Sequence, residues 1–233
     1  MKDNISLNII ARIRTDFPEK FGIPRQSGLV KDLKGKIIFE PEYRDISGLK
    51  GIEGFSHLWL IWKFSKASND KWSPTVRPPR LGGNKRMGVF ATRSPYRPNP
   101  IGLSSVKIER IIESSPEGPI IEVTGADMLD GTPIYDIKPY VPYTDCHEEA
   151  LGGFAEEVFE NSLTVDFPSE LQKLFPEEKL SSLKAILESD PRPAYKEDSD
   201  RVYGFAFSVY EIKFTVNNNV LKVKEIIKLG QKL

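Results

Sequence analysis

The sequence predicts a mainly β protein, in which a small single-sheet β-barrel precedes a small α+β domain. Before residue 145, short segments rich in Ile, Val and Phe recur at fairly even spacing between Gly, Pro, Asn or Ser. No helical pattern of about 10–15 residues separates them, which favours an antiparallel barrel or sandwich over a doubly wound sheet. We expect strands within residues 8–15, 36–40, 57–64, 88–93, 104–112 and 120–129.

The distribution of charge marks a boundary near residue 145. The chain has 33 basic and 33 acidic residues, so its total charge neither indicates nor excludes nucleic acid as a partner. Residues 71–107 contain eight basic residues and no acid, whereas residues 145–200 contain fifteen acids and five bases. We therefore expect one domain over residues 1–145 and a second over residues 146–233.

The second domain is expected to combine a helix with a β-hairpin. Apolar residues lie at helical spacing before Pro191, at Leu180, Leu183, Ile186 and Leu187. Residues 202–216 alternate between apolar and polar, and three asparagines separate them from residues 220–229. That pattern is typical of a hairpin with an Asn-rich turn.

The stretch MGVFATRSPYRPNPIGLSS, residues 87–105, places two arginines among three prolines. Proline fixes φ and pushes the preceding residue toward an extended backbone, so this loop is stiff before any ligand binds. Arg93, Arg97 and Asn99 are therefore candidates for a preorganised polar site, since the guanidinium fork suits phosphate or carboxylate. The alternative is a rigid corner whose arginines cap backbone carbonyls.

Two further loops, residues 23–28 and 75–86, repeat the combination of Pro, Arg and Gly, and we expect the three loops to converge at one mouth of the barrel. Residues 127–140 add three carboxylates, Asp127, Asp130 and Asp136. An aspartate there can accept hydrogen bonds from ribose hydroxyls or an amino group, or take a proton. Asp-Gly at residues 130–131 is equally a turn signal of conformational origin.

The composition argues against a disulfide framework and a metal site. The chain has one cysteine, Cys146, and two histidines, His57 and His147, so a zinc site of Cys and His would be hard to assemble. The short apolar run at the N-terminus is interrupted by polar residues, and no run of about 18 apolar residues occurs. We expect a cytoplasmic protein without metal or membrane contact. His57 lies in an apolar run, where it is either structural or faces the barrel lumen.

Five longer motifs resemble the bacterial tRNA methyltransferase O family, also called the TsaA-like or YaeB-like family. They are KFGIPRQSGLV, GIEGFSHLWLIW, PTVRPPRLGGNKRMGVFATRSPYRPNPIGLS, LDGTPIYDIKPY and DPRPAY. The resemblance implies that the β-barrel binds S-adenosylmethionine as cofactor. It implies methyl transfer to N6 of N6-threonylcarbamoyladenosine at position 37 of a tRNA anticodon loop, and a homodimer.

The motif positions carry over to particular residues. The resemblance places the cofactor against Arg25, Gln26, His57, Leu58, Arg93, Leu103, Asp127, Met128, Leu129 and Asp130. Leu58, Leu103 and Met128 would flank the adenine, the arginines would meet the methionine carboxylate, and an aspartate would accept from ribose or offset the sulfonium charge. Asp130 or Asp136 is the candidate base for the N6 proton. The tRNA is expected to contact Arg77, Arg80, Arg86, Arg97, Asn99, Lys138 and Tyr140.

Two other classes of protein stay open. A non-catalytic RNA-binding barrel would bind RNA with an affinity independent of S-adenosylmethionine, and a metal-dependent hydrolase would be inhibited by chelation. The acidic second domain would repel a phosphate backbone. We expect it to serve the dimer contact or to touch RNA only at its edges, at Arg192, Lys196 and the basic tail after Arg201.

Overall fold

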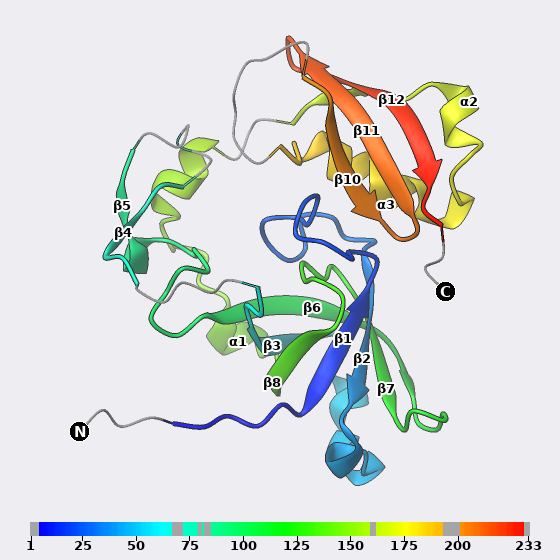
Figure 1. The fold of residues 1–233 in the computed structure, drawn as a ribbon. Helices are drawn as coiled ribbons and strands as arrows, with labels where there is room; N and C mark the ends of the chain where they lie inside the picture. Colours follow the sequence, from blue (N-terminus) through cyan, green and yellow to red (C-terminus); the bar gives the residue numbers. More distant parts are fainter. Residues whose placement is uncertain are drawn as a thin grey trace.

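The computed structural model describes residues 5–66, 72–78, 81, 85–158, 162–192 and 201–230 of the 233-residue chain. The first part of the chain forms a closed barrel (Figure 1). Its six strands are β1 (Ala11–Thr15), β2 (Lys34–Phe39), β3 (His57–Lys63), β6 (Ile101–Ile112), β7 (Ile120–Thr124) and β8 (Thr132–Pro139). The strand order is β1-β2-β7-β6-β3-β8, and each neighbouring pair is antiparallel. Three short 3₁₀ helices connect β2 to β3: η1 (Pro41–Tyr43), η2 (Ile46–Leu49) and η3 (Ile52–Gly54).

Side chains fill the barrel. In β1, Ala11 and Ile13 are buried while Arg12 and Arg14 point to solvent, as period-two alternation requires. The core is completed by fully buried side chains from the other strands and from the loop before β8, which include Ile37, Leu58, Leu60, Ile121, Met128 and Ile134. Because a barrel this small has a packed interior, a ligand has to bind at its rim or on its outer face.

β6 is longer than its neighbours, and its first half is paired on one side. Residues 101–107 pair with β3, whereas the pairing with β7 begins only at residue 107. Alternate residues of an antiparallel ladder point their backbone groups toward opposite neighbours. Since Ile108 N donates to Ser56 O on the β3 side, the N–H and C=O groups of Leu103 and Ser105 point the other way. They face an edge that no strand in the described part of the chain covers.

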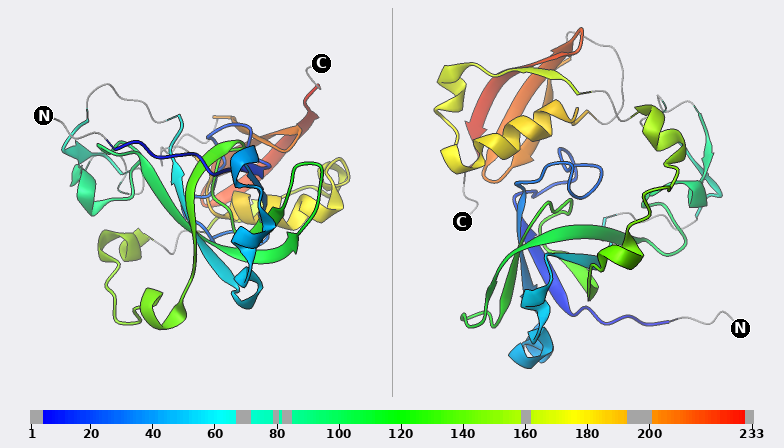
Figure 2. Two further views of the ribbon diagram at one scale, coloured as in Figure 1. Left: turned by 90° about the horizontal axis from the view of Figure 1, so that it is seen from below. Right: turned by 180° about the vertical axis from the view of Figure 1, so that it is seen from behind.

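A two-stranded ribbon, β4 (Thr75–Val76) and β5 (Met87–Gly88), lies away from the barrel between β3 and β6 in sequence (Figure 2). The prediction of a strand over residues 88–93 is wrong beyond Gly88, because a 3₁₀ turn, η5 (Val89–Ala91), follows it. Arg97 Nη1 donates to Val89 O and Thr92 O, and Thr92 N also donates to Val89 O. These hydrogen bonds occupy backbone groups of Val89 and Thr92 that would otherwise pair with a neighbouring β-strand.

A second sheet follows α1 (Pro142–Asp145) and η6 (Gly153–Val158). It consists of β9 (Thr164–Asp166), β10 (Tyr203–Phe207), β11 (Tyr210–Asn217) and β12 (Val220–Lys228), with α2 (Ser169–Gln172) and α3 (Glu177–Glu188). The order is β10-β11-β12-β9, parallel only between β12 and β9. Leu183, Ile186 and Leu187 of α3 are fully buried against this sheet. The expected fold class, a barrel with an appended α+β part, is confirmed.

The connection between β1 and β2, residues 16–33, lies between the barrel and the second sheet (Figure 1). Phe17, Val30 and Leu33 are buried in the core formed by the second sheet and α3. Gly22 has a φ of +88°, and a Cβ at this position would come within 2.3 Å of the Phe205 ring. One connection of the barrel therefore belongs to the core of the second part of the chain.

Candidate functional site

Two loops meet beside the open edge of β6. Gly28 N donates to Gly125 O at 3.0 Å, which joins the loop after β7 to residues 24–28. Ser105 N, on the open edge, donates to Ser27 Oγ at 3.2 Å. Gly125 has a φ of +81°, a backbone conformation that favours glycine, and a Cβ there would be in van der Waals contact with the Gly28 backbone at 3.4 Å. Glycine thus permits the backbone turn that brings the loop after β7 to this edge.

The proline-rich loop brings a third group to the same place. Arg93 Nη1 donates to Gln26 Oε1 at 2.5 Å, and the charge of Arg93 favours the ionised form of Asp127. The structure therefore gathers Gln26, Arg93 and Asp127, which the sequence had placed on three separate loops. Arg25, next to Gln26, is directed elsewhere: its Nη2 donates to Arg192 O at 3.2 Å in the second part of the chain.

Asp127 is a partly buried residue that supplies the carboxylate at the centre of the site. Ser104 Oγ donates to Asp127 Oδ1 at 2.6 Å, and Trp62 Nε1 donates to Ser104 Oγ at 3.0 Å. Burial raises the pKa of Asp127 to about 6, against the opposing effects of the Ser104 hydrogen bond, the backbone N–H groups of Asp127 and Ser27, and the Arg93 charge. Trp62, Ser104 and Ser27 were not predicted as site residues from the sequence. A serine at an inward position of an alternating strand is the available signal, because a buried hydroxyl needs a partner.

The apolar candidates divide between the core and the surface. Leu58 and Met128 are fully buried in the barrel, and Leu129 is partly buried, its carbonyl accepting from Thr132 Oγ1 at 2.7 Å. Leu103 is 56% exposed on the outer face beside the open edge. Of these four, Leu103 is the residue with exposed apolar surface that a ligand could contact.

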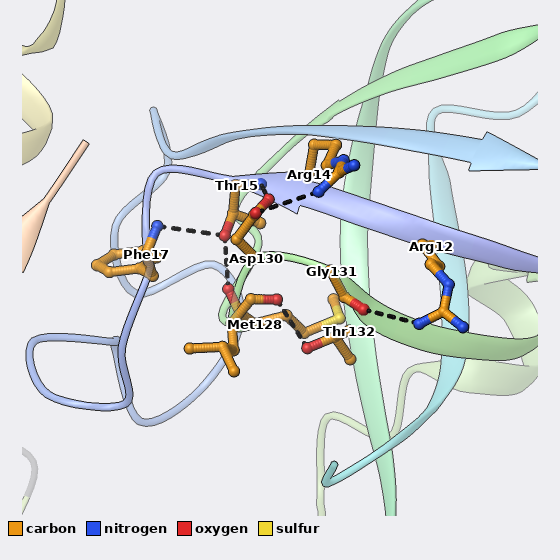
Figure 3. A network of polar contacts seen from close by, with 9 residues as sticks. Arg12, Arg14, Thr15, Phe17, Met128, Asp130, Gly131 and Thr132 are labelled. Atoms are coloured by element: carbon orange, nitrogen blue, oxygen red, sulfur yellow. Dashed lines mark hydrogen bonds and ion pairs between the residues drawn. The ribbon is translucent and has the colours of Figure 1, made fainter. Parts of the chain in front are cut away.

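Asp130 joins the loop before β8 to β1 (Figure 3). Its Oδ1 accepts from Thr15 N at 3.0 Å and its Oδ2 from Arg14 Nη1 at 3.3 Å. Thr15 Oγ1 in turn donates to Met128 O at 2.9 Å. These contacts hold the loop that carries Asp127 against β1, so Asp130 stabilises the position of that loop.

Asp136, Lys138, Tyr140 and His57 lie on the outer face of β3 and β8. Asp136 Oδ2 and Lys138 Nζ form an ion pair at 3.0 Å, and the ring of Tyr140 lies 6.2 Å from that of His57. Burial, with smaller effects from Cys146 and Asp145, raises the pKa of Tyr140. The register aligns Asp136 with Ile61 of β3 and Ile61 with Leu103 of β6. Two strand spacings, about 10 Å, thus separate Asp136 from the open edge.

The remaining basic candidates belong to the ribbon and the proline-rich loop. Arg77 is exposed after β4, Arg86 Nη1 donates to Thr75 Oγ1 at 2.9 Å, and Asn99 O accepts from Ile101 N. Arg97 caps carbonyls, as in the alternative interpretation of this loop, and its guanidinium lies 5.7 Å from the centre of the exposed Phe90 ring. Arg80 lies outside the described residues.

The barrel, its packed interior and the charged loops at one strand edge define a β-barrel protein with a candidate ligand site, and the described residues form no doubly wound parallel sheet of the dinucleotide-binding kind. Family models match the chain over residues 12–146, as the tRNA-methyltransferase O N-terminal domain, and over residues 160–229, as the TrmO C-terminal domain. The chain belongs to the tRNA-methyltransferase O family.

Individual relatives match nearly the whole chain. A tRNA (adenine(37)-N6)-methyltransferase of Escherichia coli K12 is 38% identical over 218 residues, which cover 90% of this chain and 92% of the relative. A putative S-adenosylmethionine-dependent methyltransferase, RcsF, of Pseudomonas aeruginosa is 40% identical over 207 residues, 85% of this chain and 87% of the relative. A crystal structure of TrmO from P. aeruginosa superposes with a TM-score of 0.79 at 30% identity, covering 98% and 99% of the two chains.

Proposed function

We propose that this protein transfers a methyl group from S-adenosylmethionine to N6 of adenosine 37 in tRNA, and that its substrate base is the N6-threonylcarbamoyl derivative. The family and the names of the near full-length relatives support the activity. The observation that carries it to particular residues is the convergence of Gln26, Arg93 and Asp127 beside the open edge of β6.

The groups at this edge fit the cofactor in kind. Leu103 would offer its backbone N–H and C=O to the donor and acceptor edge of adenine and its exposed side chain to the ring face. Arg93 would pair with the methionine carboxylate, as a guanidinium does well. Asp127 would accept from the ribose hydroxyls or the ammonium group. The bound cofactor supplies a methyl carbon already activated by a positively charged sulfur.

The protein itself has two tasks, to align the base with the cofactor and to accept the N6 proton. Alignment is the larger contribution when the electrophile is already activated. Asp130 and Asp136 are the candidate bases, and both already accept hydrogen bonds within the protein, Asp130 from Thr15 and Asp136 from Ile137. Asp136 has the more exposed side chain, 45% against 36% for Asp130, and lies on an open barrel face, which favours it as the group that meets a large substrate.

The tRNA would lie across the basic stretch that begins at the ribbon. Phosphate contacts would come from Arg77, Arg80, Arg86, Arg97, Asn99 and Lys138, and Tyr140 would stack on a base. We also propose a cytoplasmic homodimer without metal. No helix within the described residues is long and apolar enough to span a membrane, and those residues contain no cluster of three potential metal ligands.

The first test is isothermal titration with S-adenosylmethionine for the wild type and Arg93→Ala. We expect one-site binding that weakens about tenfold or more in the variant, the loss of one charge-assisted contact. Arg110→Ala is the matched control, because Arg110 is an exposed β6 arginine paired with Glu122 outside the site. Methyl transfer to tRNA bearing threonylcarbamoyladenosine is then measured against unmodified tRNA.

Three results would contradict the proposal. RNA binding without any affinity for S-adenosylmethionine would indicate the non-catalytic barrel. Activity abolished by a chelator would indicate a metal enzyme. Equal methylation of unmodified tRNA would remove the threonylcarbamoyl requirement while leaving the methyltransferase activity in place.

A further inference from the structure

We propose that Trp62 and Ser104 are positioning residues which hold the Asp127 carboxylate, as a hydrogen-bond acceptor, against the cofactor at the open edge of β6. The inference rests on the proposed function for the identity of the ligand. Its geometry is independent of that function, since all three residues and their contacts belong to the folded chain.

The indole of Trp62 is fixed by a glycine on the neighbouring strand. Trp62 pairs with Gly102 in the ladder between β3 and β6, and a Cβ at Gly102 would lie 2.2–2.6 Å from carbon atoms of the indole. The ring therefore lies directly over Gly102, and the Phe64 ring packs against it with 4.3 Å between centroids. Held in this way, Trp62 Nε1 is aimed at Ser104 Oγ, which is itself 1% exposed.

The hydrogen bonds can run in one direction only. The indole N–H is solely a donor, so Ser104 accepts from Trp62 and has its single proton left to give. That proton goes to Asp127 Oδ1 at 2.6 Å. The tryptophan thereby prevents the serine hydroxyl from rotating away, and the serine presents Asp127 with a donor that only an acceptor oxygen can satisfy. This chain of hydrogen bonds from Trp62 through Ser104 favours the ionised form of Asp127, which is the form that binds hydroxyl or ammonium donors.

Asp127 retains the capacity to bind a ligand. An ionised carboxylate has about four acceptor positions, and three donors within the protein act on it: the Ser104 hydroxyl and the backbone N–H groups of Asp127 and Ser27. Arg93 is the charged group of the described residues that acts on this carboxylate, whereas Gln26, Ser27, Ser104 and Trp62 do not titrate near neutral pH. Of the effects that oppose burial, the Ser104 hydrogen bond is the largest, so its loss raises the pKa of Asp127 further.

The test measures the dissociation constant of S-adenosylmethionine between pH 5 and 9 for the wild type, Ser104→Ala and Trp62→Phe. For the wild type we expect affinity to fall below a midpoint near the Asp127 pKa of about 6. In Ser104→Ala the midpoint should move up by about one pH unit, so the affinity should be about twofold lower than that of the wild type at pH 7, about tenfold lower at pH 5, and close to the wild-type value at pH 9. Trp62→Phe keeps a ring over Gly102 but leaves the serine free to rotate, so a smaller shift in the same direction is expected.

Controls separate this role from general damage to the fold. Ser115→Ala removes another hydrogen-bonded serine, in the connection between β6 and β7, and should leave the midpoint unchanged. Thermal unfolding shows that each variant is folded. In steady state, the KM for S-adenosylmethionine should rise in Ser104→Ala while kcat at saturating cofactor stays near the wild-type value.

A wild-type midpoint in a folded Ser104→Ala protein would overturn the inference. If the wild type binds no S-adenosylmethionine at all, the proposed function fails instead. The positioning chain is then tested on the protein alone, by a carbon-13 NMR titration of the Asp127 carboxyl. An upward shift of its midpoint in Ser104→Ala supports the chain of hydrogen bonds, and an unchanged midpoint refutes it.

Discussion

At the scale of single residues, the candidate site contains one carboxylate, that of Asp127, whose pKa is raised by burial. Its pKa of about 6 lies above the ordinary value of 3.8 because desolvation outweighs the donors around it. The folded protein therefore binds this proton more tightly than the unfolded chain does. Asp127 thus favours the folded state at low pH, and this contribution is lost as the pH rises through about 6.

We predict that Asp127→Asn changes the pH dependence of stability. The amide can still accept from Ser104 but does not titrate, so the free energy of unfolding of the wild type should rise relative to the variant as the pH falls from 7 to 4. The difference approaches at most about 3 kcal/mol, from a shift of about two pKa units. Urea unfolding of both proteins across this range measures it. Parallel pH profiles would show that Asp127 titrates normally.

At the scale of elements, turns decide where the strands of the second sheet end. Asn218 and Asn219 have φ values of 46° and 63° between β11 and β12, the left-handed conformations of a type I′ hairpin turn. Asn219 also forms hydrogen bonds with Ser162 and Thr164. Within the described residues the side chain of Asn218 forms no hydrogen bond, so its role there is conformational. Asparagine tolerates this backbone better than other residues with a Cβ, and glycine better still.

We expect Asn218→Ala to lower the free energy of unfolding by about 1 kcal/mol and Asn218→Gly to leave it unchanged or slightly higher. The difference between the two variants isolates the backbone conformation, because both remove the same amide. Chemical denaturation measures it. Equal destabilisation by alanine and glycine would assign the effect to the side chain instead.

The strands of the barrel differ in how well the sequence alone predicts them. Five of the six barrel strands overlap the predicted segments, because alternation of Ile, Val and Phe indicates a half-buried strand directly; β2 and β6 begin two and three residues before the predicted starts. β8 escaped notice since its Asp, Pro and Lys residues resemble a loop, and its pairing with β1 and β3 is a long-range feature. Similarly, residue chemistry pointed to Arg93 and Asp127 as candidates, but it did not point to Trp62 and Ser104, because their hydrogen bond joins residues 42 positions apart.

At the scale of the whole molecule, residues 16–33 connect the open edge of β6 to the second sheet. The same connection holds Gln26 beside Arg93 and buries Phe17 and Val30 in the second core. An ion pair between Lys179 and Asp16, with 2.5 Å between Nζ and Oδ1, adds to this attachment. The expected division into residues 1–145 and 146–233 stays a prediction, and this shared connection indicates that the two parts are energetically coupled.

We predict that Gly22→Ala destabilises the protein more than Gly28→Ala does. Both glycines have positive φ, +88° and +76°, so alanine is strained at each, typically by about 1–2 kcal/mol. Only at Gly22 does the new Cβ also meet another residue, the Phe205 ring, while Gly28 has open space. Thermal unfolding and amide hydrogen exchange in β10 should show the larger effect for Gly22→Ala, and equal effects would mean that the connection does not pack tightly on the second sheet.

The double role of residues 16–33 also limits how this protein can change over evolutionary time. A substitution at Phe17, Val30 or Leu33 has to suit the second core and still leave residues 24–28 at the edge of β6. In a family member that consists of the barrel alone, the same three positions would be exposed and should carry polar residues. Aligned sequences should therefore show these positions changing together with the presence or absence of the C-terminal domain.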